Sequence, residues 1–152
     1  MNRRVLIPID FSPASAEALA VARQFCQGGT KRLLHVLNPK QLAEQSRHTG
    51  SPVHTSEVRR EAEEKALERL RTWALGDDEI AFAVGNPAEA IRDHADEWGA
   101  DMIVMGTRGR SGIANFLSGS ATEWLVRHAK QPVLVVHDIP LDSEAACQLP
   151  PT

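Results

Sequence analysis

The stretch Val104-Met-Gly-Thr-Arg-Gly-Arg-Ser-Gly-Ile-Ala-Asn-Phe-Leu-Ser-Gly-Ser-Ala-Thr122 follows the start of a short apolar run and leads into a helical pattern. It holds four glycines, two arginines and no acidic residue. Glycines let a backbone come close to a ligand, and the amides of such a loop and of a helix that follows it point toward an anion. The stretch therefore predicts a phosphate-binding loop between a buried strand and a helix.

The spacing of the glycines excludes two well-known phosphate loops. A Walker A loop ends in Gly-Lys-Ser/Thr, and this stretch contains no lysine. The dinucleotide fingerprint needs Gly-x-Gly-x-x-Gly in the first strand-to-helix turn, which is also missing. The spacing present is Gly106-x-x-Gly109, then nine residues, then Gly119-Ser120. The loop therefore belongs to another class.

The alternation of apolar and polar residues predicts five short strands separated by four helices. Ser12 and Pro13 are expected to start the first helix, Asn86 and Pro87 the third, and Gly99 to end the third. Strands and helices in this alternation favour an α/β fold, with a parallel sheet covered on both faces. The expected strands cover residues 5–9, 33–37, 79–84, 101–105 and 132–136, and the expected helices cover residues 13–27, 57–75, 87–98 and 120–129.

The first helix and the segment after the second strand carry two further local signals. The helical spacing of the first helix predicts that Phe25 faces the sheet together with Ala18, Leu19 and Ala22. Residues 40–55 are polar and without a period, so we expect a long loop that acts as a flap over a ligand.

Length and composition bound the class of protein. A chain of 152 residues is expected to form one domain, which we place at residues 1–138, with a frayed tail at 139–152. A net charge of -3 gives no general attraction to nucleic acid or to an anionic membrane. Two cysteines form neither a disulfide framework nor a metal motif, and no apolar run could span a membrane. We therefore expect a cytoplasmic protein.

The glycine spacing resembles the nucleotide-binding signature of the universal stress protein family, in the branch whose members bind ATP. The likeness also takes in Val5–Asp10, Leu34–Val36, Gly85–Pro87 and the segment from Arg127 to Val136, so it covers nearly the whole chain. The resemblance implies a five-stranded open parallel sheet of order 3-2-1-4-5, similar to the adenine nucleotide alpha hydrolase fold. It also implies ATP as the cofactor and a regulatory role in stress response.

Ligands of open parallel sheets bind beyond the carboxyl ends of the strands, where the strand order reverses. With the implied order, this point lies between the first and fourth strands, so Asp10 faces Gly106. The resemblance implies that Asp10 and the backbone of Val36 hold the adenine and ribose, and that the glycine loop holds the phosphates. The candidate residues are Pro8, Ile9, Asp10, Val36, Met105, Gly106, Arg108, Gly109, Gly119, Ser120, Ala121 and Thr122.

Structural roles for some of these residues stay open. Asp10 is also placed to cap the first helix instead of Ser12, and Arg108 to be a plain surface charge. Ser120 forms a capping-box pattern with Glu123 and is expected to start the last helix. The six histidines show no ligand spacing, so the metal we expect is Mg²⁺ that arrives with the phosphates of ATP.

Three other functions compete with regulation by bound ATP. A slow ATPase or phosphotransferase has arginines to stabilise charge, but the sequence shows no convincing base. A receiver-like signalling domain lacks the expected acidic pair, phosphoacceptor and lysine at the strand ends. A scaffold of the same fold without nucleotide is disfavoured because the signature glycines are present. The preference between ATP, AMP and a cyclic nucleotide stays open, as does a protein partner, and the resemblance implies a homodimer through the edge strand Val133–Val136.

Overall fold

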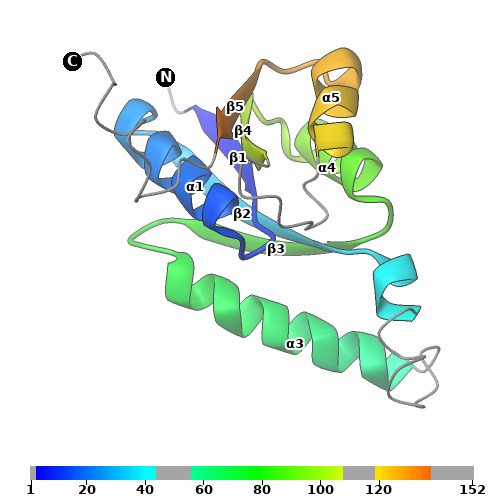
Figure 1. Cartoon of the computed structure of the whole chain (residues 1–152). Coiled ribbons are helices and arrows are strands. Elements are labelled where there is room, and N and C mark those ends of the chain that lie inside the picture. The colour runs from blue at the N-terminus through cyan, green and yellow to red at the C-terminus, as the bar shows by residue number, and fades with distance from the viewer. Residues whose placement is uncertain (1–2, 44–55, 108–118, 138–152) are drawn as a thin grey trace, which may run out of the picture.

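The computed structural model describes residues 3–43, 56–107 and 119–137 as a parallel sheet with helices packed against it (Figure 1). The strand order is β3-β2-β1-β4-β5, and every neighbouring pair is parallel. The predicted α/β fold and the order 3-2-1-4-5 are therefore confirmed. The elements are β1 (Arg4–Pro8), α1 (Pro13–Phe25), β2 (Thr30–Leu37), α3 (Ser56–Trp73), β3 (Glu79–Val84), α4 (Pro87–Trp98), β4 (Met102–Thr107), α5 (Gly119–His128) and β5 (Val133–His137), with a further helical segment at residues 39–43.

The sheet lies between two layers of helices, α1 with α3 on one face and α4 with α5 on the other (Figure 1). Successive side chains of a strand point to opposite faces, so the apolar runs of the strands supply both cores. In β1, Val5 and Ile7 pack under α1, whereas Leu6 packs under α4 and α5. The continuous apolar character of the strands is thus explained by burial on two sides.

The helix ends follow the predicted capping residues. Ser12 caps α1, where its hydroxyl oxygen accepts a hydrogen bond from the backbone N–H of Ser15 at 3.2 Å. Asn86 caps α4 in the same way, accepting from the N–H of Glu89 at 3.2 Å. Gly99 ends α4 with φ +72, a conformation that side chains disfavour. These three local predictions are confirmed.

Two strands are longer than predicted because pairing extends them. Thr30 begins β2 opposite Arg4, three residues before the apolar run starts. Gly106 and Thr107 continue β4 because they pair with Val136 and His137 of β5. Backbone pairing with a neighbour therefore sets the strand ends where side-chain hydropathy does not.

Three predictions about the helices are wrong. Phe25 is 72% exposed, because at the end of α1 it is the next residue, Cys26, that packs against the core. Residues 39–43 are helical rather than loop, with the N–H of Leu42 donating to the carbonyl of Asn38. Ser120 lies inside the first turn of α5, which begins at Gly119, so it does not start the helix as predicted, and Glu123 forms an ion pair with Arg127 one turn further on.

Candidate functional site

The strand order reverses between β1 and β4, and the pairing of these two strands is short. They are paired only at Val5 with Met102 and at Leu6 with Ile103, whereas β1 stays paired with β2 up to Pro8 and Leu34. The N–H of Ile9 donates to Leu34 of β2, so the backbone polar groups of Pro8 face β4. Because proline has no N–H, it cannot extend the ladder toward β4. The carboxyl ends of β1 and β4 are therefore free of each other.

Gly106 brings the end of β4 against the first turn of α1. A Cβ atom at Gly106 would lie 2.3 Å from the carbonyl oxygen of Ala14 and 2.9 Å from the nitrogen of Ser15. Such distances are far inside van der Waals contact, so only glycine fits here without a backbone shift. Gly106 therefore packs against the first turn of α1, which begins just after the turn that holds Asp10.

Asp10 occupies the turn between β1 and α1. Its Oδ1 accepts hydrogen bonds from the backbone N–H of Ser12 at 2.9 Å and from the Ser12 hydroxyl. Its Oδ2 is buried and has no hydrogen-bond partner among the described residues. Asp10 thus supports the cap residue Ser12 and does not replace it, and one carboxylate oxygen is left for an N–H or O–H donor.

The first turn of α5 presents a second such atom. Thr122 is only 6% exposed, and its Oγ1 has no hydrogen-bond partner in the described part of the chain. Gly119, Ser120 and Ala121 begin the helix, so their N–H groups belong to the turn that has no helical acceptors. The N-terminus of a helix attracts an anion through the N–H groups of its first turn and through its dipole.

The remaining described candidates contribute backbone and packing. Ile9, Val36 and Met105 are at most 1% exposed, and their side chains pack in the two cores. The carbonyl oxygen of Ile9 accepts a hydrogen bond from Nδ1 of His35 at 2.7 Å. The side chains of these three residues are therefore core. The backbone N–H and carbonyl of Ile9 are also used within the protein, by Leu34 and His35, so only backbone groups of Val36 and Met105 are left to consider for a ligand.

An aromatic cluster behind the turn is absent from the sequence-based candidates. The ring of Phe11 lies 4.9 Å from the ring of His35 and 5.5 Å from the ring of Trp73, the latter edge-on. The guanidinium carbon of Arg69 lies 3.9 Å from the centre of the Phe11 ring. Phe11 itself has a φ of +62, which is rare for an aromatic residue. The signal in the sequence is Arg69 and Trp73, four residues apart on one helix face.

Burial also affects the protonation of His35. Desolvation lowers the pKa of its imidazole from the usual 6.5, while the hydrogen bond to Ile9 and the charge of Asp10 raise it by smaller amounts. The neutral ring is thus favoured, with Nδ1–H donating to the Ile9 carbonyl.

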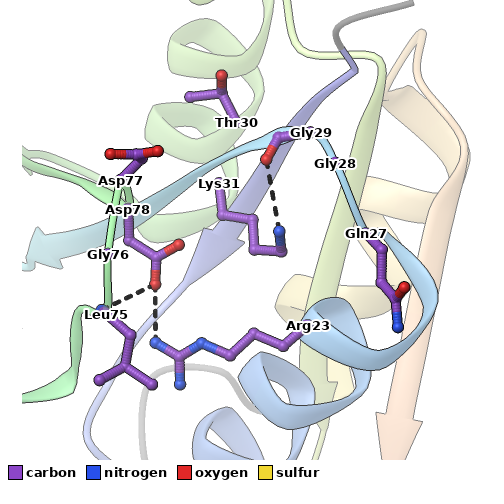
Figure 2. Close-up of a pocket in the computed structure, with 10 residues that line it drawn as sticks. All are labelled: Arg23, Gln27, Gly28, Gly29, Thr30, Lys31, Leu75, Gly76, Asp77 and Asp78. Atoms are coloured by element: carbon purple, nitrogen blue, oxygen red, sulfur yellow. Dashed lines mark hydrogen bonds and ion pairs between the residues drawn. The ribbon is translucent and has the colours of Figure 1, made fainter.

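A pocket of about 670 Å³ lies at the amino-terminal ends of the strands, where β2 begins and opposite the carboxyl ends described above (Figure 2). Figure 2 shows Arg23 reaching toward Asp78, with which it forms an ion pair at 2.7 Å. Asp78 also accepts from the N–H of Leu75 at 3.1 Å. The central charges of this pocket are therefore already paired with each other, unlike Asp10 Oδ2.

The model of the universal stress protein family matches residues 1–137. The chain belongs to this family. A universal stress protein of Thermus aquaticus, described by its position in the QAH/OAS sulfhydrylase 3' region, is 32% identical over 139 residues, which are 90% of this chain and 99% of the relative. The solved structure of MJ0577 from Methanocaldococcus jannaschii superposes with a TM-score of 0.72 at 25% identity, over 92% of this chain and 99% of MJ0577.

Two further solved universal stress proteins share the fold and contain nucleotides. One is a complex with cAMP, with a TM-score of 0.58 and 24% identity over 91% of this chain and 98% of the other. The second is a family protein of Arabidopsis thaliana with AMP bound, with a TM-score of 0.57 and 17% identity over 92% of this chain and 97% of the other. At these identities, the two structures show that this universal stress protein shares their fold.

Some predicted parts of this universal stress protein lie outside the described residues. They are Arg108 and Gly109 of the glycine loop, residues 44–55 of the expected flap and residues 139–152 of the expected tail. Within the described residues, no group of three histidine, cysteine or acidic side chains could hold a metal ion. No helix in the same ranges is long and apolar enough to cross a membrane.

Proposed function

We propose that this universal stress protein binds an adenine nucleotide, ATP in particular, beyond the carboxyl ends of β1 and β4, and that occupancy of the site regulates its interaction with a partner. The observation that supports this most is the buried Oδ2 of Asp10, which has no hydrogen-bond partner among the described residues and lies just before the first turn of α1, against which Gly106 packs. A buried carboxylate oxygen without a donor is costly, and a ligand hydroxyl or amine relieves that cost.

The two ends of the proposed site, at Asp10 and at the start of α5, fit different chemical groups of a ligand. Asp10 repels phosphate and suits the hydroxyls of ribose or an amine of adenine. The amides of Gly119 to Ala121 and the Thr122 hydroxyl suit phosphate oxygens. A molecule with a polar sugar at one end and an anionic tail at the other satisfies both, and nucleoside phosphates have this form. The cAMP and AMP complexes of the two fold relatives agree with this choice.

The finer assignments are proposals from the sequence. Arg108 and Gly109 extend the anionic end and favour ATP over AMP, with Mg²⁺ bound through the phosphates. Regulation is favoured over fast turnover because the sequence shows no convincing base, and Asp10 is assigned to the sugar and adenine rather than to an attacking water. The strand β5 is an edge of the sheet, with Leu134 38% exposed, and its free ladder favours a homodimer.

The direct test is to denature the purified protein and identify any released nucleotide by mass spectrometry, then to titrate nucleotide-free protein with ATP and AMP. We expect Asp10→Asn to lower the affinity for both ATP and AMP about tenfold or more, since it removes a charged acceptor. Asp77→Asn, an exposed aspartate at the amino-terminal ends of the strands, is the matched control. Equal affinity of Asp10→Asn and the unmodified protein would refute the site.

The phosphate end is tested by two separate variants. Gly119→Val places a branched side chain at the first residue of α5, and Gly109→Val does so in the glycine loop. We expect ATP to lose more affinity than AMP in both, because ATP places more charge against these amides. Identical losses for the two nucleotides would contradict the assignment of this end to the phosphates.

A further inference from the structure

Phe11 holds a backbone conformation that needs support. Its φ of +62 lies in the left-handed region, which costs a residue with a side chain free energy that surrounding contacts must offset. This residue joins Asp10 to Ser12, and the two are linked by the hydrogen bonds to Oδ1. The conformation at Phe11 therefore sets the direction in which the Asp10 carboxylate points.

The ring of Phe11 is held by the end of α3. Trp73 meets the ring edge-on at 5.5 Å and 86°, and the Arg69 guanidinium carbon lies 3.9 Å from its centre. Trp73 is tied in turn to α1, because Arg23 donates to its carbonyl oxygen at 2.7 Å. Arg69 and Trp73 are one helical turn apart, so the two side chains of α3 that contact the Phe11 ring are held by one rigid helix.

We infer that Phe11 is a positioning residue that acts through Asp10, and that α3 sets the affinity for the adenine nucleotide through the contacts of Arg69 and Trp73 with the Phe11 ring. This inference rests on the proposed function. When the ring is removed, its contacts with Arg69 and Trp73 no longer help to offset the strained backbone, so the turn relaxes and the carboxylate loses its fixed direction. Nucleotide binding must then restore that direction, which lowers the affinity.

The decisive experiment is a double-mutant cycle with Asp10→Asn and Phe11→Ala, read as the dissociation constants of ATP and AMP by calorimetry. If Phe11 acts through Asp10, Phe11→Ala lowers the nucleotide affinity of the otherwise unmodified protein about tenfold. In the Asp10→Asn background the same substitution lowers the affinity by less than about twofold. Both nucleotides lose the same factor, because they share the adenine and ribose that Asp10 holds. A residue with only a packing role gives additive losses, and that result would overturn the inference.

Two further variants keep the test independent of folding. Phe11→Tyr retains the ring and is expected to retain the affinity within about twofold. Arg69→Met leaves the core untouched and removes the cation from the ring, and we expect it to lower the affinity for ATP about two- to fivefold. Phe25→Ala, the same substitution at a 72% exposed ring, and Arg71→Met, on an exposed arginine of the same helix, are the controls.

The outcomes separate the two proposals. If the unmodified protein binds no adenine nucleotide, the proposed function fails. If it binds ATP and both Phe11→Ala and Arg69→Met bind with unchanged affinity, the proposed function stands and the role of Phe11 and α3 is refuted.

Discussion

Gly106 lies directly against Ala14, and a Cβ atom on Gly106 would sit 2.3 Å from the Ala14 carbonyl oxygen and 2.4 Å from its carbonyl carbon. Both partners are backbone atoms, which cannot rotate away as a flexible side chain can. The contact joins the end of β4 to the start of α1. The same contact therefore affects stability and the geometry of the proposed site.

The first prediction concerns this contact. Gly106→Ala is expected to lower the free energy of unfolding by about 2 kcal/mol or more and to weaken ATP binding, because β4 or α1 must shift. Gly76→Ala is the control: its φ of +56 is unfavourable for alanine but its surroundings are open, so it is expected to cost about 1 kcal/mol and leave binding unchanged. Urea unfolding and calorimetry measure both, and equal destabilisation by the two variants would be inconsistent with the close contact.

The second prediction concerns Thr122. Because its buried Oγ1 has no protein partner among the described residues, Thr122→Val removes an unpaired polar atom and keeps the shape. We expect the nucleotide-free protein to gain up to about 1 kcal/mol of stability while ATP binds about three- to tenfold more weakly. Thermal unfolding with and without ATP measures both changes. A variant that binds ATP as tightly as the unmodified protein would remove Thr122 from the site.

The third prediction concerns pH. Burial lowers the pKa of His35 below 6.5, so the unfolded chain binds a proton at a higher pH than the folded protein does. The contribution of His35 to stability is then complete above about pH 6.5 and is lost as the pH falls toward the folded pKa. His94 acts in the same direction, through burial and the nearby Arg32.

Urea unfolding between about pH 7.5 and pH 5.5 tests this sign. In His35→Asn, the side-chain amide takes the place of the Nδ1 donor to Ile9 and does not titrate, so we expect a flatter pH dependence than in the unmodified protein. A steeper loss of stability toward acid in the variant would show that the sign is wrong.

The fourth prediction concerns the pocket at the amino-terminal ends of the strands. The Asp78 side chain is 9% exposed and accepts from Arg23 and from the N–H of Leu75. Asp78→Asn is expected to cost about 1 to 3 kcal/mol of stability, because Arg23 loses its charged partner. ATP binding is expected to stay unchanged, since this pocket lies at the other end of the strands. A loss of ATP affinity would place the ligand here instead.

Local sequence signals were sufficient for much of the fold. Ser12, Asn86 and Gly99 mark helix ends through chemistry that acts within a few residues, and the structure has them in those roles. Pairing between distant segments is not visible locally. That is why the extension of β2 to Thr30, set by its pairing with Arg4, was missed.

The candidate site also divides into residues that the local sequence reveals and residues whose role depends on packing between distant segments. Asp10 stands out in the sequence as a charge directly after an apolar run, and Gly106 as the first glycine of the glycine spacing; the structure packs Gly106 against the first turn of α1, which begins just after Asp10. Phe11 does not stand out, since its positive φ and its contact with Arg69 exist only after α3 has packed on the sheet.

The pairing of β1 with β4 also bears on how the protein is made. Asp10 leaves the ribosome early, but Gly106 and the start of α5 follow about a hundred residues later. The first three strands emerge without the partner that completes the middle of the sheet, so one edge of β1 stays uncovered until the last third of the chain is translated. If the proposed site is right, a nucleotide cannot stabilise the fold before both Asp10 and the start of α5 have been synthesised.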